Sequence, residues 1–210
     1  MYDVLIIGAG PGGIFTAYEL MERRPDLKVA VFETGHPPNR RKCPIDGEKV
    51  KSCIHCKCCS IMSGFGGAGA FSDGKYNITN EFGGPLYEYI GKKAATELME
   101  YVDTINLRYG GEGTKLYSTA GTSLKKTCMQ HGLHLLDASV RHLGTDINYI
   151  VLEHLYDYLK EQVEFHFDCP IDTVDKTDNR SRLYSGTQFF EGRKCVISAG
   201  RHGSKGPGKV

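Results

Sequence analysis

The chain has 210 residues, of which 40% are hydrophobic and 24% are charged, the composition of an ordinary globular protein. Its formal net charge of +1 argues against a general electrostatic grip on nucleic acid or on an anionic membrane. No apolar run approaches the ~20 residues that a membrane-spanning helix needs, and residues 1–7 lack the basic start of a signal peptide. We therefore expect a cytoplasmic protein without a nucleic-acid or membrane partner.

The first 34 residues have the pattern of a β-α-β unit. Val4–Ile7 is an unbroken apolar run, typical of a parallel strand buried on both faces. Gly8–Gly13 follows and fits the spacing G-x-G-x-x-G. A helical pattern comes after it, with an apolar face of Ile14, Ala17, Tyr18 and Met21. A second apolar strand, residues 28–33, ends in Glu33. Strand, glycines, helix and terminal acid in this order predict a dinucleotide-binding half of a Rossmann fold.

Each residue type in this loop has a physical role. Gly8 allows the tight turn, Gly10 lets a pyrophosphate approach the backbone, and Gly13 lets the helix pack close to the strand. Pro11 and Gly12 complete the loop at the helix N-terminus, whose N–H groups and dipole suit a diphosphate. A carboxylate at Glu33 accepts hydrogen bonds from ribose hydroxyls and repels a 2′-phosphate, which argues against NADP. The unit alone leaves FAD and NAD open.

A glycine-rich stretch follows between Ser63 and Lys75. Its five glycines argue against a regular helix or strand and favour backbone that lies close against a ligand. A flexible linker is the alternative, but it would expose Phe65 and Phe71.

The remaining elements alternate between helix and strand. We expect helices at residues 91–109 and 121–131, a strand at 133–136, and a longer helix from Thr145. The apolar positions of the longer helix are Ile147, Ile150, Val151, Leu155 and Tyr158. Strand patterns follow at residues 163–168, 171–176, 182–190 and 194–198, and the last ends in Ala199-Gly200.

Together these pieces resemble the glutathione-reductase-like FAD-binding fold. More narrowly, the chain resembles the uncharacterised bacterial FAD-dependent dehydrogenase family of NAD(P)/FAD-dependent oxidoreductases. The residues that carry the resemblance are Tyr2–Gly13, Glu33, Cys53–Cys56, Ile61–Lys75 and Arg141–Asp146. The run from Ile61 to Lys75 is the most specific of them.

The resemblance implies that the glycine loop holds the FAD diphosphate and that Glu33 holds the adenosine ribose. It also implies that the Ile171 backbone faces the adenine and that Ala199 and Gly200 close over the cofactor. The loop of Ser72, Asp73, Gly74 and Lys75 would approach the isoalloxazine, where the Lys75 ammonium would stabilise a reduced flavin.

The implied activity is that of an FAD-dependent oxidoreductase acting on a small-molecule substrate. NAD(P)H is a candidate electron donor. Flavin chemistry belongs to the cofactor, so no catalytic residue is predicted. Two alternatives stay open: a truncated, non-catalytic flavoprotein remnant, and an NAD-binding Rossmann module.

The expected fold class is α/β, with a parallel sheet, a small antiparallel meander and a partial inserted substrate domain. We assign residues 1–83 and 143–202 to the FAD-binding domain, 84–142 to the insert and 203–210 to a frayed tail. Proteins of this kind continue beyond the strand at residues 194–198. The resemblance therefore implies a fragment, a truncated gene product or a split subunit, whose fold is completed by a missing C-terminal part or by a partner chain.

Five cysteines lie within 17 residues, at positions 43, 53, 56, 58 and 59. The spacing of Cys43, Cys53, Cys56 and Cys59 makes them candidate ligands of an iron–sulfur cluster or of zinc. Redox-active thiols and reduced bystanders are the alternatives. The basic run Arg40–Lys42 either contacts phosphates or forms a solvated loop.

Overall fold

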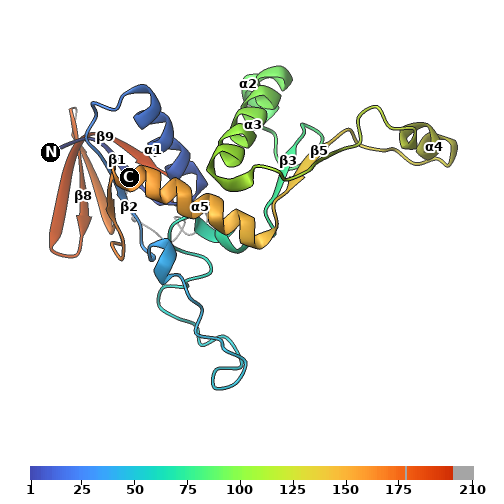
Figure 1. Ribbon diagram of the computed structural model, residues 1–210. Coiled ribbons are helices and arrows are strands. Elements are labelled where there is room, and N and C mark those ends of the chain that lie inside the picture. Colours follow the sequence, from blue (N-terminus) through green and yellow to red (C-terminus); the bar gives the residue numbers. More distant parts are fainter. Residues whose placement is uncertain (178, 201–210) are drawn as a thin grey trace. The chain divides into compact units, whose positions relative to one another are not determined.

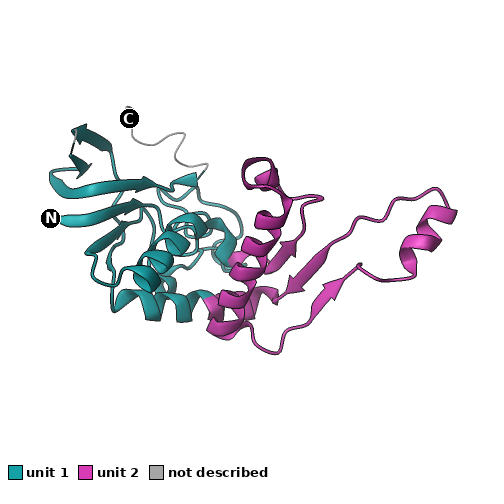
Figure 2. Ribbon diagram, turned by 90° about the horizontal axis from the view of Figure 1, so that it is seen from above, with its two compact units in different colours: residues 1–70, 152–210 teal, residues 71–151 magenta. Residues whose placement is uncertain are grey.

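The computed structural model describes residues 1–177 and 179–200, and the chain divides into two compact units (Figure 2). Unit 1 contains residues 1–70 and the chain from Leu152 onward, and unit 2 contains Phe71–Val151. The expected insert, residues 84–142, lies within unit 2. The expected tail, residues 203–210, lies outside the described residues.

Unit 1 is built on a six-stranded sheet in the order β6-β2-β1-β9-β8-β7 (Figure 1). Its strands are β1 (Tyr2–Ile7), β2 (Val29–Phe32), β6 (Glu164–His166), β7 (Thr173–Thr177), β8 (Arg180–Ser185) and β9 (Gln188–Ile197). Strands β6, β2, β1 and β9 are parallel, whereas β8 and β7 are antiparallel additions beyond β9. This arrangement confirms the predicted α/β fold, a parallel Rossmann-like sheet with a small antiparallel meander.

The centre of this sheet is dry because its strands are apolar on both faces. Leu5 and Ile6 of β1 and Ala30 of β2 have no exposed surface. Helix α1 (Pro11–Arg23) covers the sheet with the predicted apolar face, since its buried side chains include Ile14, Ala17, Tyr18 and Met21. Two short 3₁₀ helices, η1 (Pro38–Arg40) and η2 (Gly67–Phe71), lie in the long connection after β2.

Unit 2 has a three-stranded antiparallel sheet in the order β3-β5-β4. Its elements are β3 (Lys75–Ile78), α2 (Leu86–Ile90), α3 (Lys92–Asn106), a π-type turn η3 (Leu107–Gly111), β4 (Leu116–Ser118), α4 (Leu124–Gln130) and β5 (Ser139–His142). The segment around α4 extends away from β4 and β5 as an arm (Figure 1). None of the α4 residues is buried.

A buried ion pair joins the sheet of unit 2 to α3. The Arg141 guanidinium donates to both carboxylate oxygens of Asp103, at 2.6 and 2.7 Å, and to the Thr114 carbonyl at 2.6 Å. The side chains of Arg141 and Asp103 are only 8% and 9% exposed. The hydrogen bond to Asp103 raises the pKa of Arg141, so the guanidinium stays charged.

Three sequence-based expectations are wrong in detail. Residues 133–136 form no strand, and a turn at Gly186, with φ of 56°, divides the expected strand 182–190 into β8 and β9. Helix α5 (Gly144–Lys160) forms as expected and buries Val151 and Leu155 of its predicted apolar face. It also buries Asn148 and Leu159, however, whereas the predicted Ile150 is 40% exposed. The buried face of α5 therefore lies about one residue away from its most apolar face, because contacts with the rest of the protein decide which face is covered.

No helix in the described part of the chain combines the length and apolar character that crossing a membrane requires.

Candidate dinucleotide site

The ends of three parallel strands in unit 1 define the edge where a ligand would bind. Ile7, the last residue of β1, pairs with Phe32 of β2 and with Ile197 of β9. The glycine loop, Glu33 and Ser198 therefore all leave the sheet at the same carboxyl edge. Open α/β sheets bind ligands at this edge, next to the strand where the chain order reverses.

The glycines of the loop differ in how much room there is for a side chain. A Cβ on Gly13 would overlap the Gly8 carbonyl, and one on Gly8, whose φ is +98°, would lie 2.5 Å from the Ser198 carbonyl oxygen. A Cβ on Gly12 would lie 2.5 Å from Ser198 Oγ. At Gly10, by contrast, a Cβ would meet no atom within 4 Å. Gly8 and Gly13 are therefore required by packing against backbone atoms, whereas the Ser198 hydroxyl near Gly12 can rotate away and Gly10 borders open space.

The backbone at the start of α1 offers donors to that open space. Among the described residues, the N–H groups of Gly10, Gly12 and Gly13 have no hydrogen-bond partner, since the first bond of the helix runs from Ile14 N to Gly10 O. No side chain caps this end, and no acidic residue lies in the first turn. Free N–H groups together with the positive end of a 13-residue helix suit a diphosphate. The residues present therefore fit the phosphates of a dinucleotide.

Glu33 is buried at this edge and is engaged by three backbone segments. Its Oε2 accepts from Ala9 N at 2.8 Å, and its Oε1 accepts from Gly35 N at 2.8 Å and from Gly64 N at 2.9 Å. The residue is 7% exposed. A carboxylate has about four acceptor positions, so one on Oε2 remains for a ribose hydroxyl. Glu33 thus joins the glycine loop to the glycine-rich stretch. The sequence analysis did not predict this connection.

Arg41 holds the start of the glycine-rich stretch and the residues just before it. Its guanidinium donates to the carbonyls of Ser60, Ile61 and Phe65, at 2.9, 2.9 and 2.6 Å. The residue is only 7% exposed, so neither alternative considered for Arg40–Lys42 describes it. No sequence signal separates Arg41 from its basic neighbours.

The neighbouring Arg40 has a different environment. It is 56% exposed and pairs with Asp168, which also pairs with His36. Asp168 adopts a positive φ of 54°, and its N–H donates to Gly35 O at 3.0 Å. This surface triad connects the loop after β2 to the loop after β6.

The predicted residues from the C-terminal half of unit 1 lie in two places. Ala199 lies beside the first glycine turn, because a Cβ on Gly8 would be 3.3 Å from Ala199 Cα. Gly200 follows it with a positive φ of 58°. Ile171 is 8% exposed and packs in the core cluster that contains Ile7 and Phe32. Its predicted contact with adenine through the backbone stays a prediction.

The predicted loop at residues 72–75 belongs to unit 2. Gly74 has φ of 62°, and a Cβ there would lie 2.8 Å from the Gly144 carbonyl oxygen. The Ser72 hydroxyl accepts from Gly74 N at 3.3 Å. The Lys75 ammonium pairs with Asp73 at 2.6 Å on the surface and thereby lowers the pKa of that carboxyl. The ammonium predicted to face a reduced flavin therefore has a carboxylate partner in its own loop.

The cysteines of the cluster differ in exposure. Cys53 and Cys56 are exposed, whereas Cys43 and Cys59 are half-buried. Within the described ranges, no group of three or more cysteine, histidine or acidic side chains is placed to hold a metal ion. Cys58 donates to Thr34 O at 3.5 Å, and burial raises the pKa of its thiol. Metal ligation by Cys43, Cys53, Cys56 and Cys59 stays a prediction.

No protein-family model matches the chain. Among solved structures, glycine oxidase from Geobacillus kaustophilus is similar at 17% sequence identity, with a TM-score of 0.53 over 97% of this chain and 57% of that one. The complex of CtdE with FAD aligns at 14% identity, with a TM-score of 0.48 over 96% of this chain and 39% of that one. The fold is the Rossmann-like fold of FAD-binding domains.

A short stretch is also similar to curated enzymes. Thiamine thiazole synthases of Phaeosphaeria nodorum and Yarrowia lipolytica are each 56% identical to this chain over 36 residues. The match spans 17% of this chain and 11% of those proteins. The chain also spans only 57% of the glycine oxidase, so these likenesses describe parts of longer proteins.

Proposed function

We propose that this chain binds FAD at the carboxyl edge of its parallel sheet and is part of an FAD-dependent oxidoreductase for a small-molecule substrate. The observation that carries the proposal is the start of α1, where three backbone N–H groups have no partner in the described chain and Gly10 borders open space. A diphosphate supplies the acceptors and the negative charge that this helix end lacks.

The residues of unit 1 have separate roles in this proposal. The N–H groups of Gly10, Gly12 and Gly13 donate to the phosphate oxygens, and the remaining acceptor of Glu33 Oε2 takes a ribose hydroxyl. Bound FAD supplies the hydride- or electron-accepting group. Glu33 and Arg41 hold the glycine loop and the glycine-rich stretch in place. FAD binding therefore costs little further conformational entropy.

An NAD-binding module is the second candidate, because the phosphate loop alone suits either dinucleotide. The antiparallel strands β7 and β8 beside β9, followed by Ala199-Gly200, favour FAD. This order differs from the second half of a plain NAD domain, which continues with further parallel strands.

The experiment uses the full chain, purified and mixed with excess FAD, followed by gel filtration and a visible absorption spectrum of the protein peak. We expect flavin bands in the peak and free FAD in the supernatant after denaturation. Retention of NAD in place of flavin, or a colourless peak, would overturn the proposal.

The substitution Gly10→Val tests the site itself. The side chain enters space that is open in the protein, so the fold should tolerate it, whereas the pyrophosphate loses its place. We expect the affinity for FAD to fall at least about 100-fold, with an unchanged melting temperature of the apoprotein. Lys176→Val, on the exposed face of β7, is the control for adding a valine and should bind FAD normally. Equal FAD content in both variants would contradict the assignment.

A further inference from the structure

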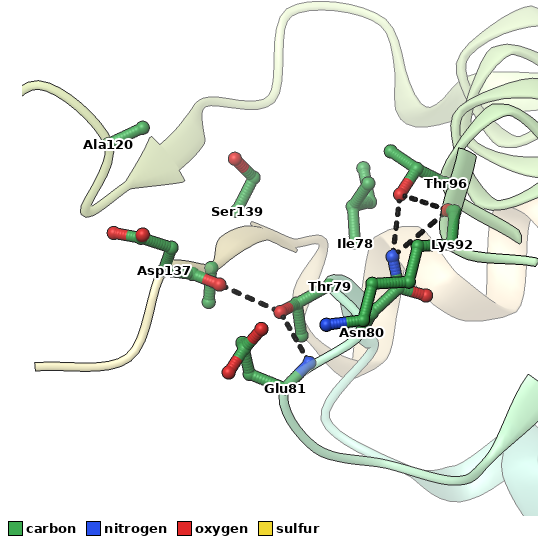
Figure 3. Close-up of a pocket in the computed structure, with 10 residues that line it drawn as sticks. Ile78, Thr79, Asn80, Glu81, Lys92, Thr96, Ala120, Asp137 and Ser139 are labelled. Atoms are coloured by element: carbon green, nitrogen blue, oxygen red, sulfur yellow. Dashed lines mark hydrogen bonds between the residues drawn. The ribbon is translucent and has the colours of Figure 1, made fainter. Parts of the chain in front are cut away.

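Unit 2 contains an open surface pocket, lined by both polar and apolar groups, that the proposed flavin site does not use. Its volume is about 240 Å³, below the ~300 Å³ at which cavities for drug-sized ligands begin. Figure 3 shows Thr79, Asn80 and Glu81 on the loop after β3, with Lys92 and Thr96 of α3 on one side and Asp137 on the other. The volume of the pocket suits a small ligand.

Hydrogen bonds within the wall hold this loop in place. Asn80 Nδ2 donates to the Lys92 carbonyl at 3.1 Å and to Thr96 Oγ1 at 2.8 Å, which fixes the loop to the start of α3. Thr79 Oγ1 donates to the Asp137 carbonyl at 2.8 Å and accepts from Glu81 N at 3.1 Å. The cavity is therefore preorganised, and its neutral polar groups are largely occupied with one another.

The charged groups of the wall remain available. Across the described chain, the Lys92 ammonium has no carboxylate partner and lies 5.5 Å from the centre of the Tyr87 ring, and the Glu81 carboxylate has no ion-pair or hydrogen-bond partner. Asp137 uses Oδ2 to bind Lys125 at 2.6 Å, which leaves its Oδ1 as an acceptor. One cavity thus presents one cationic donor and two carboxylates.

We propose that this cavity binds a small zwitterion, of which a free α-amino acid is the simplest member. The carboxylate of the ligand pairs with Lys92, and its ammonium pairs with Glu81 and the free oxygen of Asp137. A purely anionic ligand would face the unpaired Glu81 carboxylate, and a purely cationic ligand would leave Lys92 unpaired. Only a ligand that carries both charges can pair with Lys92 and with the carboxylates of the pocket.

The proposal concerns unit 2 and does not depend on flavin binding. The probe is glycine, titrated into the isotope-labelled full chain while the backbone amide resonances are followed by NMR. Acetate and methylammonium, each carrying one of the two charges, are titrated at matched ionic strength. We expect glycine to shift the amides of residues 79–81 and 92–96 and to bind about tenfold more tightly than either half-molecule.

Two charge-removing variants and two controls complete the test. Lys92→Gln and Glu81→Gln should each weaken glycine binding about tenfold, since each removes one charge-assisted contact. Lys93→Gln and Glu97→Gln are the controls, because these residues form an exposed pair on α3, 3.8 Å apart, and do not line the cavity. Both controls should bind glycine like the parent chain.

Three results would overturn the proposal. One is that glycine leaves the amides of residues 79–81 and 92–96 unmoved across the titration. Another is that acetate or methylammonium shifts these amides as strongly as glycine does. The third is that the control variants lose as much affinity as the cavity variants, which would show a general effect of surface charge.

Discussion

Arg41 and Glu33 are buried ions that act on backbone rather than on each other. Arg41 donates to three carbonyls of residues 60–65, and Glu33 accepts from Gly64 in the same stretch. A glycine-rich segment has a large conformational entropy to lose on folding. Charge-assisted hydrogen bonds from both sides offset that cost, and their loss would leave buried carbonyls or N–H groups without partners.

Substitution of Arg41 should separate this role from ordinary surface charge. We expect Arg41→Ala to lower the free energy of unfolding by about 3 kcal/mol, because it leaves the buried Phe65 carbonyl and two partly buried carbonyls unsatisfied. Arg40→Ala removes an exposed pair with Asp168 and should change it by less than about 1 kcal/mol. Urea denaturation followed by circular dichroism measures both. Equal losses in the two variants would show that Arg41 has no special structural role.

Helix α3 and strand β5 depend on one buried contact between Asp103 and Arg141. The pair is bidentate, and Thr114 O takes a further guanidinium N–H. Burying two charges has a desolvation cost that the pair nearly offsets, so the main effect of the contact is to fix the position of α3 against the sheet of unit 2. The motif Arg141–Asp146 that carried the family resemblance thus includes a packing residue.

Removal of one partner from this pair should be costly. Asp103→Asn leaves the Arg141 guanidinium buried without its counter-charge, and we expect a loss of about 3 kcal/mol in the free energy of unfolding. Glu97→Gln, on the exposed side of the same helix, is the control and should leave stability unchanged within error. If Asp103→Asn unfolds at the same urea concentration as the control, the pair does not hold α3 in place.

Stability is distributed unevenly over the molecule as a whole. Strand β1 lies between β2 and β9 in the sheet of unit 1, and its residues from Val4 onward are buried. The arm of unit 2 is the opposite case, since Leu124, Met129 and Leu133 are 57%, 69% and 64% exposed. Local opening is easiest where few apolar contacts must be broken.

Hydrogen exchange should reveal this difference directly. We expect the amides of residues 4–7 and 29–32 to exchange slowest, at the rate of global unfolding, and those of residues 124–136 to exchange within the fastest class. Mass spectrometry of peptides after timed deuteration measures both sets. Slow exchange in residues 124–136 would show that the arm is covered, and would contradict the uneven distribution.

The sequence by itself determined the β-α-β unit, the apolar face of α1 and the α/β class, because these features follow from patterns within about 30 consecutive residues. It also indicated the antiparallel strands after α5, although it missed the turn at Gly186 and predicted a strand at residues 133–136. These misses share a cause, since the pairing of strands decides which apolar runs become strands.

Only the tertiary structure decided which polar residues are buried and which segments they join. Nothing in the run Arg40–Lys42 distinguishes the buried Arg41 from the exposed Arg40, because the difference lies in the carbonyls that residues 60–65 bring to one of them. The acceptors left on Glu33 and the charges that meet in the cavity of unit 2 likewise come from segments far apart in the chain. Local patterns specify backbone conformation, whereas partners of buried charges are specified by contacts that exist only after folding.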